Sequence, residues 1–283
     1  MKYLITGATG DIGSRVANRL IERGERPRVF VRDLAKARAR FSDRVDFAVG
    51  DLADAESLAA ALTGVDAIFL VNSGPRLAEH DAAAAKVAKD AGVMRLVKLS
   101  SMDSLVGVGT GVWHAQGETA IRASGIGFTF VQPTGFMSNV LFWAHSIKAE
   151  GVVRSATGDG KIPFIHPEDI AGVAVEALTR PEYDGASLAI SGPEALSYAE
   201  MAAKIAIATG KAIRFEAISE ETVHQRMMND GDELAVIEAH LSIYRRIREG
   251  RLAEVTQNVE RVLGRKPISF EQWVEEHLSS FVQ

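Results

Sequence analysis

The sequence predicts an α/β protein with a doubly wound parallel sheet and a smaller, mainly helical C-terminal region. Three observations predict this fold. Short apolar, β-branched runs alternate with Ala-rich segments of helical period over most of the first two-thirds of the 283 residues. The runs are apolar almost throughout, which is typical of strands that helices cover on both faces. From Ser197 onward the chain is mainly of helical period, which indicates a smaller helical region beside the sheet that right-handed crossovers between the strands produce.

Strands and helices alternate from the N-terminus. The expected strands are Tyr3–Thr6, Arg28–Val31, Val45–Val49, Ala67–Val71, Leu96–Leu99 and Phe128–Val131. The expected helices between them are Ile12–Arg23, Leu34–Phe41, Ala55–Leu62, Leu77–Ala91 and His114–Ala123. Asp54 is an expected N-cap, because its carboxylate can accept from the first amides of the helix behind it. Glycines fit the ends of several helices: Gly24, Gly64, Gly92 and Gly125.

The pattern changes after Thr134. An apolar helix is expected at Phe136–Ala149, followed by a glycine-rich loop at 157–160. A helix at Pro167–Leu178 and a strand at Leu188–Ile190 are then expected to return the chain to the sheet.

The remaining chain is expected to be mainly helical, with one more strand signal at Ile213–Phe215. We therefore expect a sheet domain at 1–190, with the apolar helix and loop inserted near 136–165. A smaller helical region is expected at 191–283, beside the carboxyl edge of the sheet.

Composition excludes several classes of function. The 32 basic and 37 acidic side chains give a net charge of −5 without a basic block, so nucleic acid is not an expected partner. With no cysteine, the chain has no disulfide, thiolate nucleophile or thiolate metal site. Apolar stretches such as Ala67–Val71 and Val140–Ala144 fall far short of the roughly 20 residues of a membrane span. The N-terminus lacks a signal-peptide core, so a cytoplasmic protein is expected.

The strongest chemical signal is the segment Thr6-Gly7-Ala8-Thr9-Gly10-Asp11-Ile12-Gly13 between the first strand and the first helix. Gly7 permits a tight turn, Gly10 permits close approach of a pyrophosphate, and Gly13 permits close packing of helix on strand. The helix N-terminus would offer unpaired amides and a partial positive charge to the phosphates. The segment predicts a dinucleotide site.

The spacing GxxGxxG around TGATG resembles the short-chain dehydrogenase/reductase superfamily. Further matches resemble its atypical, NmrA-like branch, and the chain is most similar there to quinone, azo-dye and triphenylmethane reductases. These matches are Val31-Arg32-Asp33, Gly50-Asp51-Leu52, Pro167-Glu168-Asp169-Ile170-Ala171 and Gly192-Pro193-Glu194-Ala195-Leu196-Ser197-Tyr198. The resemblance implies a Rossmann-like, NAD(P)-binding domain at 1–190 and substrate contacts from 191–283.

The residues after the second strand favour NADP(H) over NAD(H). Many NAD-binding relatives have an acidic residue here, whereas this chain has Arg32, with Lys36 one helical turn further on. A guanidinium binds a 2′-phosphate bidentately, and a second cation adds to the attraction. Asp33 could serve the ribose instead, but the N-cap of the following helix is the favoured interpretation. A solvated surface charge is the competing interpretation of Arg32.

The resemblance also implies further cofactor contacts, all at the carboxyl ends of expected strands. Asp51 and Leu52 would flank the adenine, and Asn72, Ser73 and Gly74 would follow the ribose path. Ser100 and Ser101 end the fifth strand, and Pro133 and Thr134 follow the sixth strand near the nicotinamide.

The Tyr-x-x-x-Lys pair of typical short-chain reductases is missing, because none of the four tyrosines has a lysine four residues later. His114 and Glu118 stand in its place, one turn apart on the same helix face. They could form an acid/base couple in which Glu118 holds the imidazole. A polar helix face without catalytic role is the competing interpretation.

Without that relay, the sequence favours hydride transfer to a conjugated acceptor such as a quinone or dye, where water can complete protonation. The seven histidines show no spacing for a metal site, so no metal is expected. A nucleotide-binding redox sensor without turnover is the alternative function, because NmrA-like proteins include such regulators. The oligomeric state does not follow from the sequence.

An apolar segment after Pro133-Thr134-Gly135 is the expected substrate site. Large, adaptable side chains suit a flat acceptor, although burial in the core explains each of them equally well. The expected residues are Phe136, Met137, Phe142 and Trp143.

Overall fold

The computed structural model describes residues 1–282, which divide into two compact units. Unit 1 consists of Met1–Leu105, Gly111–Gln132 and Pro167–Ala189. Unit 2 consists of Val106–Thr110, Pro133–His166 and the chain from Ile190 onward. The insertion expected near 136–165 in the sheet domain thus lies within the segment 133–166, which groups with the C-terminal part of the chain.

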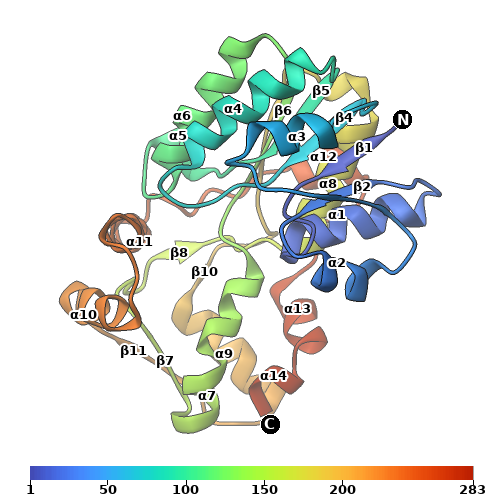
Figure 1. The fold of residues 1–283 in the computed structure, drawn as a ribbon. Helices are drawn as coiled ribbons and strands as arrows, with labels where there is room; N and C mark the ends of the chain where they lie inside the picture. The colour runs from blue at the N-terminus through green and yellow to red at the C-terminus, as the bar shows by residue number, and fades with distance from the viewer. Residues whose placement is uncertain (283) are drawn as a thin grey trace. The chain divides into compact units, whose positions relative to one another are not determined.

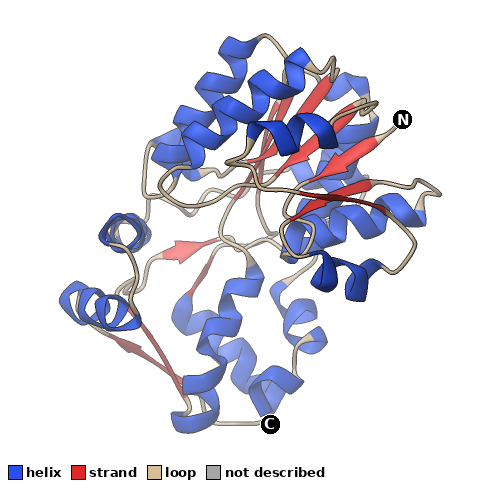
Figure 2. Ribbon diagram, in the orientation of Figure 1, coloured by secondary structure: helices blue, strands red, loops and turns tan. Residues whose placement is uncertain are grey.

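Unit 1 is built on a seven-stranded sheet in the order β3-β2-β1-β4-β5-β6-β9 (Figure 2). The pairings among β1 to β6 are all parallel, with Ile5 beside Val29 on one side and beside Phe69 on the other. This order confirms the doubly wound, Rossmann-like fold. The strands are β1 (Tyr3–Ile5), β2 (Arg28–Val31), β3 (Asp46–Val49), β4 (Ala67–Leu70), β5 (Arg95–Leu99), β6 (Gly127–Pro133) and β9 (Ser187–Ile190).

Helices cover both faces of this sheet (Figure 1). On one face α1 packs against α8, and on the other α4 packs against α3 and α6. The helices are α1 (Asp11–Glu22), α2 (Leu34–Phe41), α3 (Ala55–Ala61), α4 (Leu77–Asp90), α5 (Asp103–Val106), α6 (Gly111–Ser124), α8 (Pro167–Thr179) and the 3₁₀ turn η2 (Pro181–Tyr183). Among residues 1–282, no helix has both the length and the apolar character needed to cross a bilayer.

Local side-chain chemistry explains where α2 and α3 begin. Asp33 accepts a hydrogen bond from the Lys36 amide at 2.9 Å, and Asp54 accepts one from the Glu56 amide at 3.0 Å. Each carboxylate satisfies an amide that has no partner within its helix. Both expected N-caps are confirmed.

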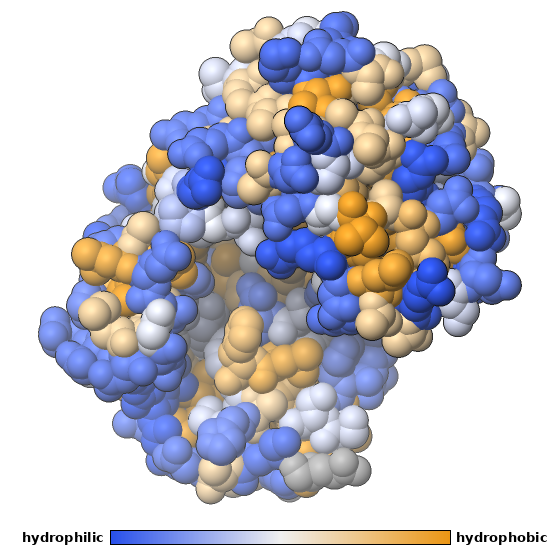
Figure 3. Space-filling model, viewed as in Figure 1, coloured by the Kyte–Doolittle hydropathy of each residue, from blue (hydrophilic) through white to orange (hydrophobic). Residues whose placement is uncertain are grey.

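The central strands β1, β4 and β5 of unit 1 are buried along their whole length, whereas the edge strand β3 is partly exposed. Leu4, Ile68, Leu96 and Phe130 have exposed fractions of zero and share one cluster with residues of the covering helices. Hydrophilic side chains cover much of the molecular face in Figure 3, with apolar groups between them. Burial of the continuous apolar runs is therefore the main stabilising contribution in this unit.

Unit 2 is mainly helical and contains two short strand pairs, of which the sequence predicts only the strand at Ile213–Phe215, confirmed as β11. The segment Met137–Trp143 is a 3₁₀ helix (η1) and only Ala144–Glu150 is α-helical (α7), which corrects the continuous helix expected there. β7 (Val152–Ser155) pairs in parallel with β11 (Arg214–Ala217), and β8 (Lys161–Ile162) pairs antiparallel with β10 (Leu196–Ser197). The other helices are α9 (Tyr198–Thr209), α10 (Glu220–Asp230), α11 (Leu234–Arg248), α12 (Asn258–Leu263), α13 (Phe270–Glu276) and α14 (Ser279–Val282).

Candidate functional site

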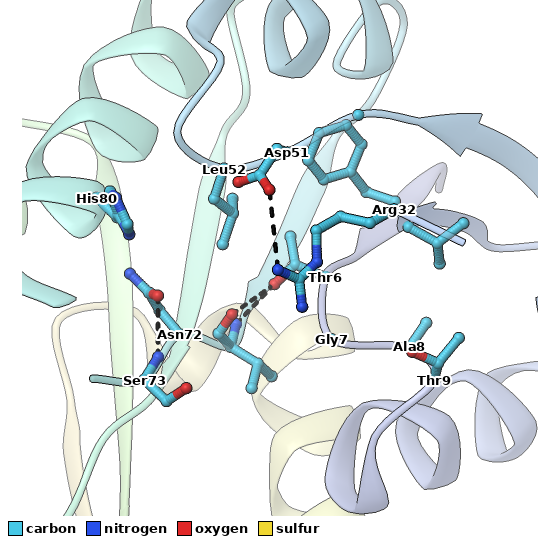
Figure 4. A pocket seen from close by; sticks show the side chains of 14 residues that line it. Thr6, Gly7, Ala8, Thr9, Arg32, Asp51, Leu52, Asn72, Ser73 and His80 are labelled. Carbon is cyan, nitrogen blue, oxygen red and sulfur yellow. Dashed lines mark hydrogen bonds and ion pairs between the residues drawn. The ribbon is translucent and has the colours of Figure 1, made fainter. Parts of the chain in front are cut away.

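Unit 1 contains a cavity of about 320 Å³ at the carboxyl ends of its central strands (Figure 4). This edge of a doubly wound sheet is where such folds bind ligands. Eight of the expected cofactor residues line it: Gly7, Ala8, Thr9, Arg32, Asp51, Leu52, Asn72 and Ser73. Three more lining residues, Thr6, Val31 and Gly50, belong to the motifs quoted above but were not expected as contacts. Sequence reasoning missed Phe30, Val71 and His80.

The turn after β1 depends on a residue without a side chain at position 7. Gly7 has φ of +61°, and a Cβ there would lie 2.9 Å from Cβ of Val71. The Thr6 hydroxyl accepts from the Val71 amide at 2.7 Å, so it holds this turn against the end of β4. The backbone from Gly7 to Thr9 therefore forms one wall of the cavity.

The N-terminus of α1 meets this turn at close range. A Cβ at Gly13 would overlap the Gly7 carbonyl, so glycine is required for the helix to approach the strand. Gly10 is the N-cap and provides no side-chain hydrogen bond to the start of this helix. The first amides, including those of Asp11 and Ile12, thus have no partner within the helix and suit an anion.

Charged side chains meet where β2 and β3 end. Arg32 Nη1 lies 3.9 Å from Asp51 Oδ2, and both side chains line the cavity. Asp33 is engaged as the N-cap of α2, in agreement with the favoured interpretation of the sequence. Lys36 is exposed on α2 and is not among the residues that line the cavity.

The side chain of Asn72 makes hydrogen bonds to other groups of the protein. Its amide nitrogen donates to the Leu77 carbonyl at 3.2 Å and to Asp81 Oδ1 at 3.4 Å, while its Oδ1 accepts from the Ser73 amide at 2.9 Å. Gly74 follows with φ of +88° in the turn before α4. Asn72 therefore shapes the start of α4, from which His80 reaches the cavity (Figure 4).

Behind this wall lies a fully buried ion pair. Lys98 Nζ of β5 is 2.5 Å from Asp81 Oδ2 of α4, and both side chains have exposed fractions of zero. Burial lowers the pKa of Lys98, and the Asp81 carboxylate opposes that shift. The pair fixes α4 to the centre of the sheet.

Glu118 binds three groups from three different elements. Its Oε1 accepts from Ser100 Oγ at 2.5 Å, from Gln132 Nε2 at 2.8 Å and from Ser104 Oγ at 3.1 Å. The carboxylate is buried, and charge-assisted bonds of this kind are the stronger ones. Glu118 thus joins the ends of β5 and β6 to α5, while Ser101 Oγ accepts from the Asp103 amide at 3.1 Å.

His114 is half-buried on α6, and no described residue partners its buried Nδ1. Burial and then the positive charge of Lys98 lower the pKa of His114 to about 3, so the ring is neutral at physiological pH. Since Glu118 bonds to Ser100, Ser104 and Gln132, it does not hold the imidazole. The expected His114–Glu118 couple is corrected on this point.

Asp103 is a titratable group that sequence reasoning did not single out. Burial raises the pKa of this carboxyl to about 6, against the lowering effect of its hydrogen bond with Ser101. No local sequence signal marks it, because its desolvation arises only when α5 folds over the end of β5.

The expected residues of unit 2 have different surroundings. The Thr134 hydroxyl donates to the Pro163 carbonyl at 2.6 Å, and Pro133 ends β6. Met137 is 1% exposed in the core of unit 2, which favours the core interpretation, whereas Phe142 is 85% exposed. Phe136 and Trp143 are half-buried, and Trp143 packs on Tyr198 with ring centroids 4.8 Å apart.

Comparisons with known proteins identify a family for this chain. Residues 7–181 match a family described as NAD(P)H-binding. The chain is 37% identical over 284 residues to an NAD(P)H azoreductase of Xenophilus azovorans, with 98% of each chain covered. It is 38% identical over 289 residues to a (4-alkanoyl-5-oxo-2,5-dihydrofuran-3-yl)methyl phosphate reductase of Streptomyces griseus, again with 98% of each covered.

A solved structure agrees in fold over the whole chain. The NADPH-dependent quinone oxidoreductase of Escherichia coli in complex with NADPH superimposes with a TM-score of 0.88 at 25% identity. The alignment covers 99% of this chain and 100% of that one. The two-part organisation is therefore shared with a nucleotide-dependent reductase.

Proposed function

The chain belongs to the NAD(P)H-binding family, and from this premise we propose that it transfers hydride from NADPH to a quinone-like or other conjugated acceptor. That it is an NAD(P)H-dependent oxidoreductase follows from its close relatives. The observation that carries the finer proposal is the cavity, where Arg32 and the glycine turn that leads into α1 lie together, although Gly10 and the first residues of α1 are not among those that line it.

The chemical groups around the cavity suit a dinucleotide that carries a 2′-phosphate. The free amides of α1 suit the pyrophosphate, and the open backbone at Gly10 leaves room for it, because a Cβ there would meet only Gly7 O within 4 Å. Arg32 would bind the 2′-phosphate, and Asp51 and Leu52 would flank the adenosine. When bound, the reduced nicotinamide supplies a hydride.

The names of the relatives support a conjugated acceptor. One acts on azo compounds, and another on a dihydrofuran that carries oxo and alkanoyl groups. A neutral His114 is a poor proton donor, which supports an acceptor whose reduced form takes its proton from water. Phe136 and Trp143 are the candidates for contact with the acceptor, and Ser100, Ser101, Pro133 and Thr134 are candidates for the nicotinamide end.

Arg32→Ala is expected to reduce the preference for NADPH over NADH. Charge-assisted hydrogen bonds contribute about 1.5–3 kcal/mol each, so the wild-type preference should be roughly tenfold or more. Calorimetric titration of both nucleotides measures it, with Lys36→Ala as a control that removes a cation outside the cavity lining. Equal affinities for the two nucleotides in the wild type would contradict the assignment of Arg32.

His114→Phe is expected to lower turnover by less than the roughly 100-fold minimum typical of a lost general acid. The physical reason is that the half-buried ring is neutral in the wild type. Loss of NADPH absorbance with a panel of quinones and azo dyes measures the rate. Complete loss of activity at unchanged NADPH affinity would instead identify His114 as the proton donor. Tight NADPH binding by the wild type without oxidation of NADPH by any acceptor would favour a sensor.

A further inference from the structure

Two opposite charges face each other across the mouth of the cavity. Arg32 comes from the end of β2 and Asp51 from the segment after β3, and Figure 4 shows their side chains pointing toward one another. The side chains are 83% and 49% exposed, and their closest charged atoms are 3.9 Å apart. A pair this exposed is held weakly, so Arg32 can turn toward a ligand while the Asp51 charge stays beside it.

The charged residues that follow Arg32 in the sequence do not reach the cavity beside this pair. Asp33 is directed to the Lys36 amide as the cap of α2, and neither residue lines the cavity. Among the lining residues of the described chain, Arg32 and Asp51 are the only Arg, Lys, Asp or Glu side chains. The cation expected to attract a 2′-phosphate therefore has a carboxylate as its immediate neighbour.

We propose that Asp51 sets the coenzyme selectivity by weakening the binding of 2′-phosphorylated nucleotides. Its negative charge neutralises part of the attraction of Arg32 and repels a phosphate placed on that side chain. A ribose 2′-hydroxyl, by contrast, can donate a hydrogen bond to the same carboxylate. Asp51 thus narrows the ratio of NADPH to NADH affinity. This inference rests on the proposed binding of the adenosine end at Arg32.

The test compares Asp51→Asn with the wild type in calorimetric titrations of 2′,5′-ADP and 5′-AMP, two fragments that differ only in the 2′-phosphate. Asparagine retains the acceptor for the Ala53 amide, which Asp51 Oδ1 binds at 2.9 Å, so the turn should persist. Asp51→Asn should bind 2′,5′-ADP roughly fivefold more tightly, which corresponds to the loss of about 1 kcal/mol of repulsion between two like charges in water. Affinity for 5′-AMP should stay constant or fall, and the gain should shrink at high salt.

A matched control is Asp90→Asn on α4, which makes the same charge change outside the cavity, at a carboxylate 2.6 Å from Lys86. It should leave the ratio of the two affinities unchanged. An equal change in both affinities in Asp51→Asn, or no change in either, would overturn the selectivity role. If the wild type binds neither these fragments nor NADPH, the proposed nucleotide site itself fails. A melting curve for each variant verifies that it is folded.

Discussion

Gly10→Val is expected to abolish nucleotide binding while the chain stays folded. The backbone at Gly10 has ordinary dihedral angles, with φ of −88°, and a Cβ would lie 3.2 Å from the Gly7 carbonyl oxygen without another neighbour within 4 Å. The protein therefore tolerates a side chain after a small shift. The same side chain would occupy space beside the α1 amides that the pyrophosphate needs.

The readout is the stabilisation that a nucleotide gives to the folded state. At a concentration of about 100 times Kd, NADPH should stabilise the wild type by about 2.7 kcal/mol and raise its melting temperature, whereas Gly10→Val should show no shift. Gly10→Ala is the graded control and should retain part of the shift. If the valine variant keeps the full shift, the phosphates bind elsewhere.

Lys98→Met is expected to destabilise the fold by about 3–5 kcal/mol, because it leaves the Asp81 carboxylate buried without its counter-charge. Both side chains of this pair are fully buried, so water cannot compensate the loss. The remaining neighbour of Asp81 Oδ1 is the Asn72 amide at 3.4 Å, which is a long hydrogen bond. α4 and the cavity wall that depends on it should loosen together.

Urea denaturation of the single and double variants tests this prediction. Asp81→Leu combined with Lys98→Met should recover much of the lost free energy of unfolding, because an apolar pair of similar volume needs no partner. A surface pair provides the control: Lys86→Met should change the free energy of unfolding by less than about 1 kcal/mol. A loss of that small size in Lys98→Met would mean that the buried charges are not coupled.

The strands and helices of unit 1 could be predicted because their signals are local. The buried strand Ala67–Leu70 is marked by its apolar run, and the starts of α2 and α3 by Asp33 and Asp54. The glycine loop was equally clear, since Gly7 and Gly13 serve geometric needs within a single turn. Short-range sterics and hydrogen bonds determine all of these features.

The polar contacts of the site were not predictable, because residues far apart in the sequence provide them. Glu118 and His114 share a helix face, yet the carboxylate bonds to Ser100, Ser104 and Gln132, which reach it only after the sheet forms. The pairing of β7 with β11 could not be predicted for a similar reason, because the paired residues are about 60 positions apart in the sequence. The strand β8 has only two residues, too few to show a periodic pattern.

Unit 1 is assembled from three separate stretches of the chain, and this affects the order in which it can fold during synthesis. The last stretch, Pro167–Ala189, provides α8, whose Glu168 pairs with Arg15 and Arg19 of α1. Glu176 of α8 pairs with Arg23, the C-cap of α1. Until the ribosome has released that stretch, the face of α1 that packs on α8 has no cover. A nascent chain that ends near Gln132 already carries the whole glycine loop but exposes this face, and exposed apolar surface of this kind makes a partly folded chain prone to aggregation.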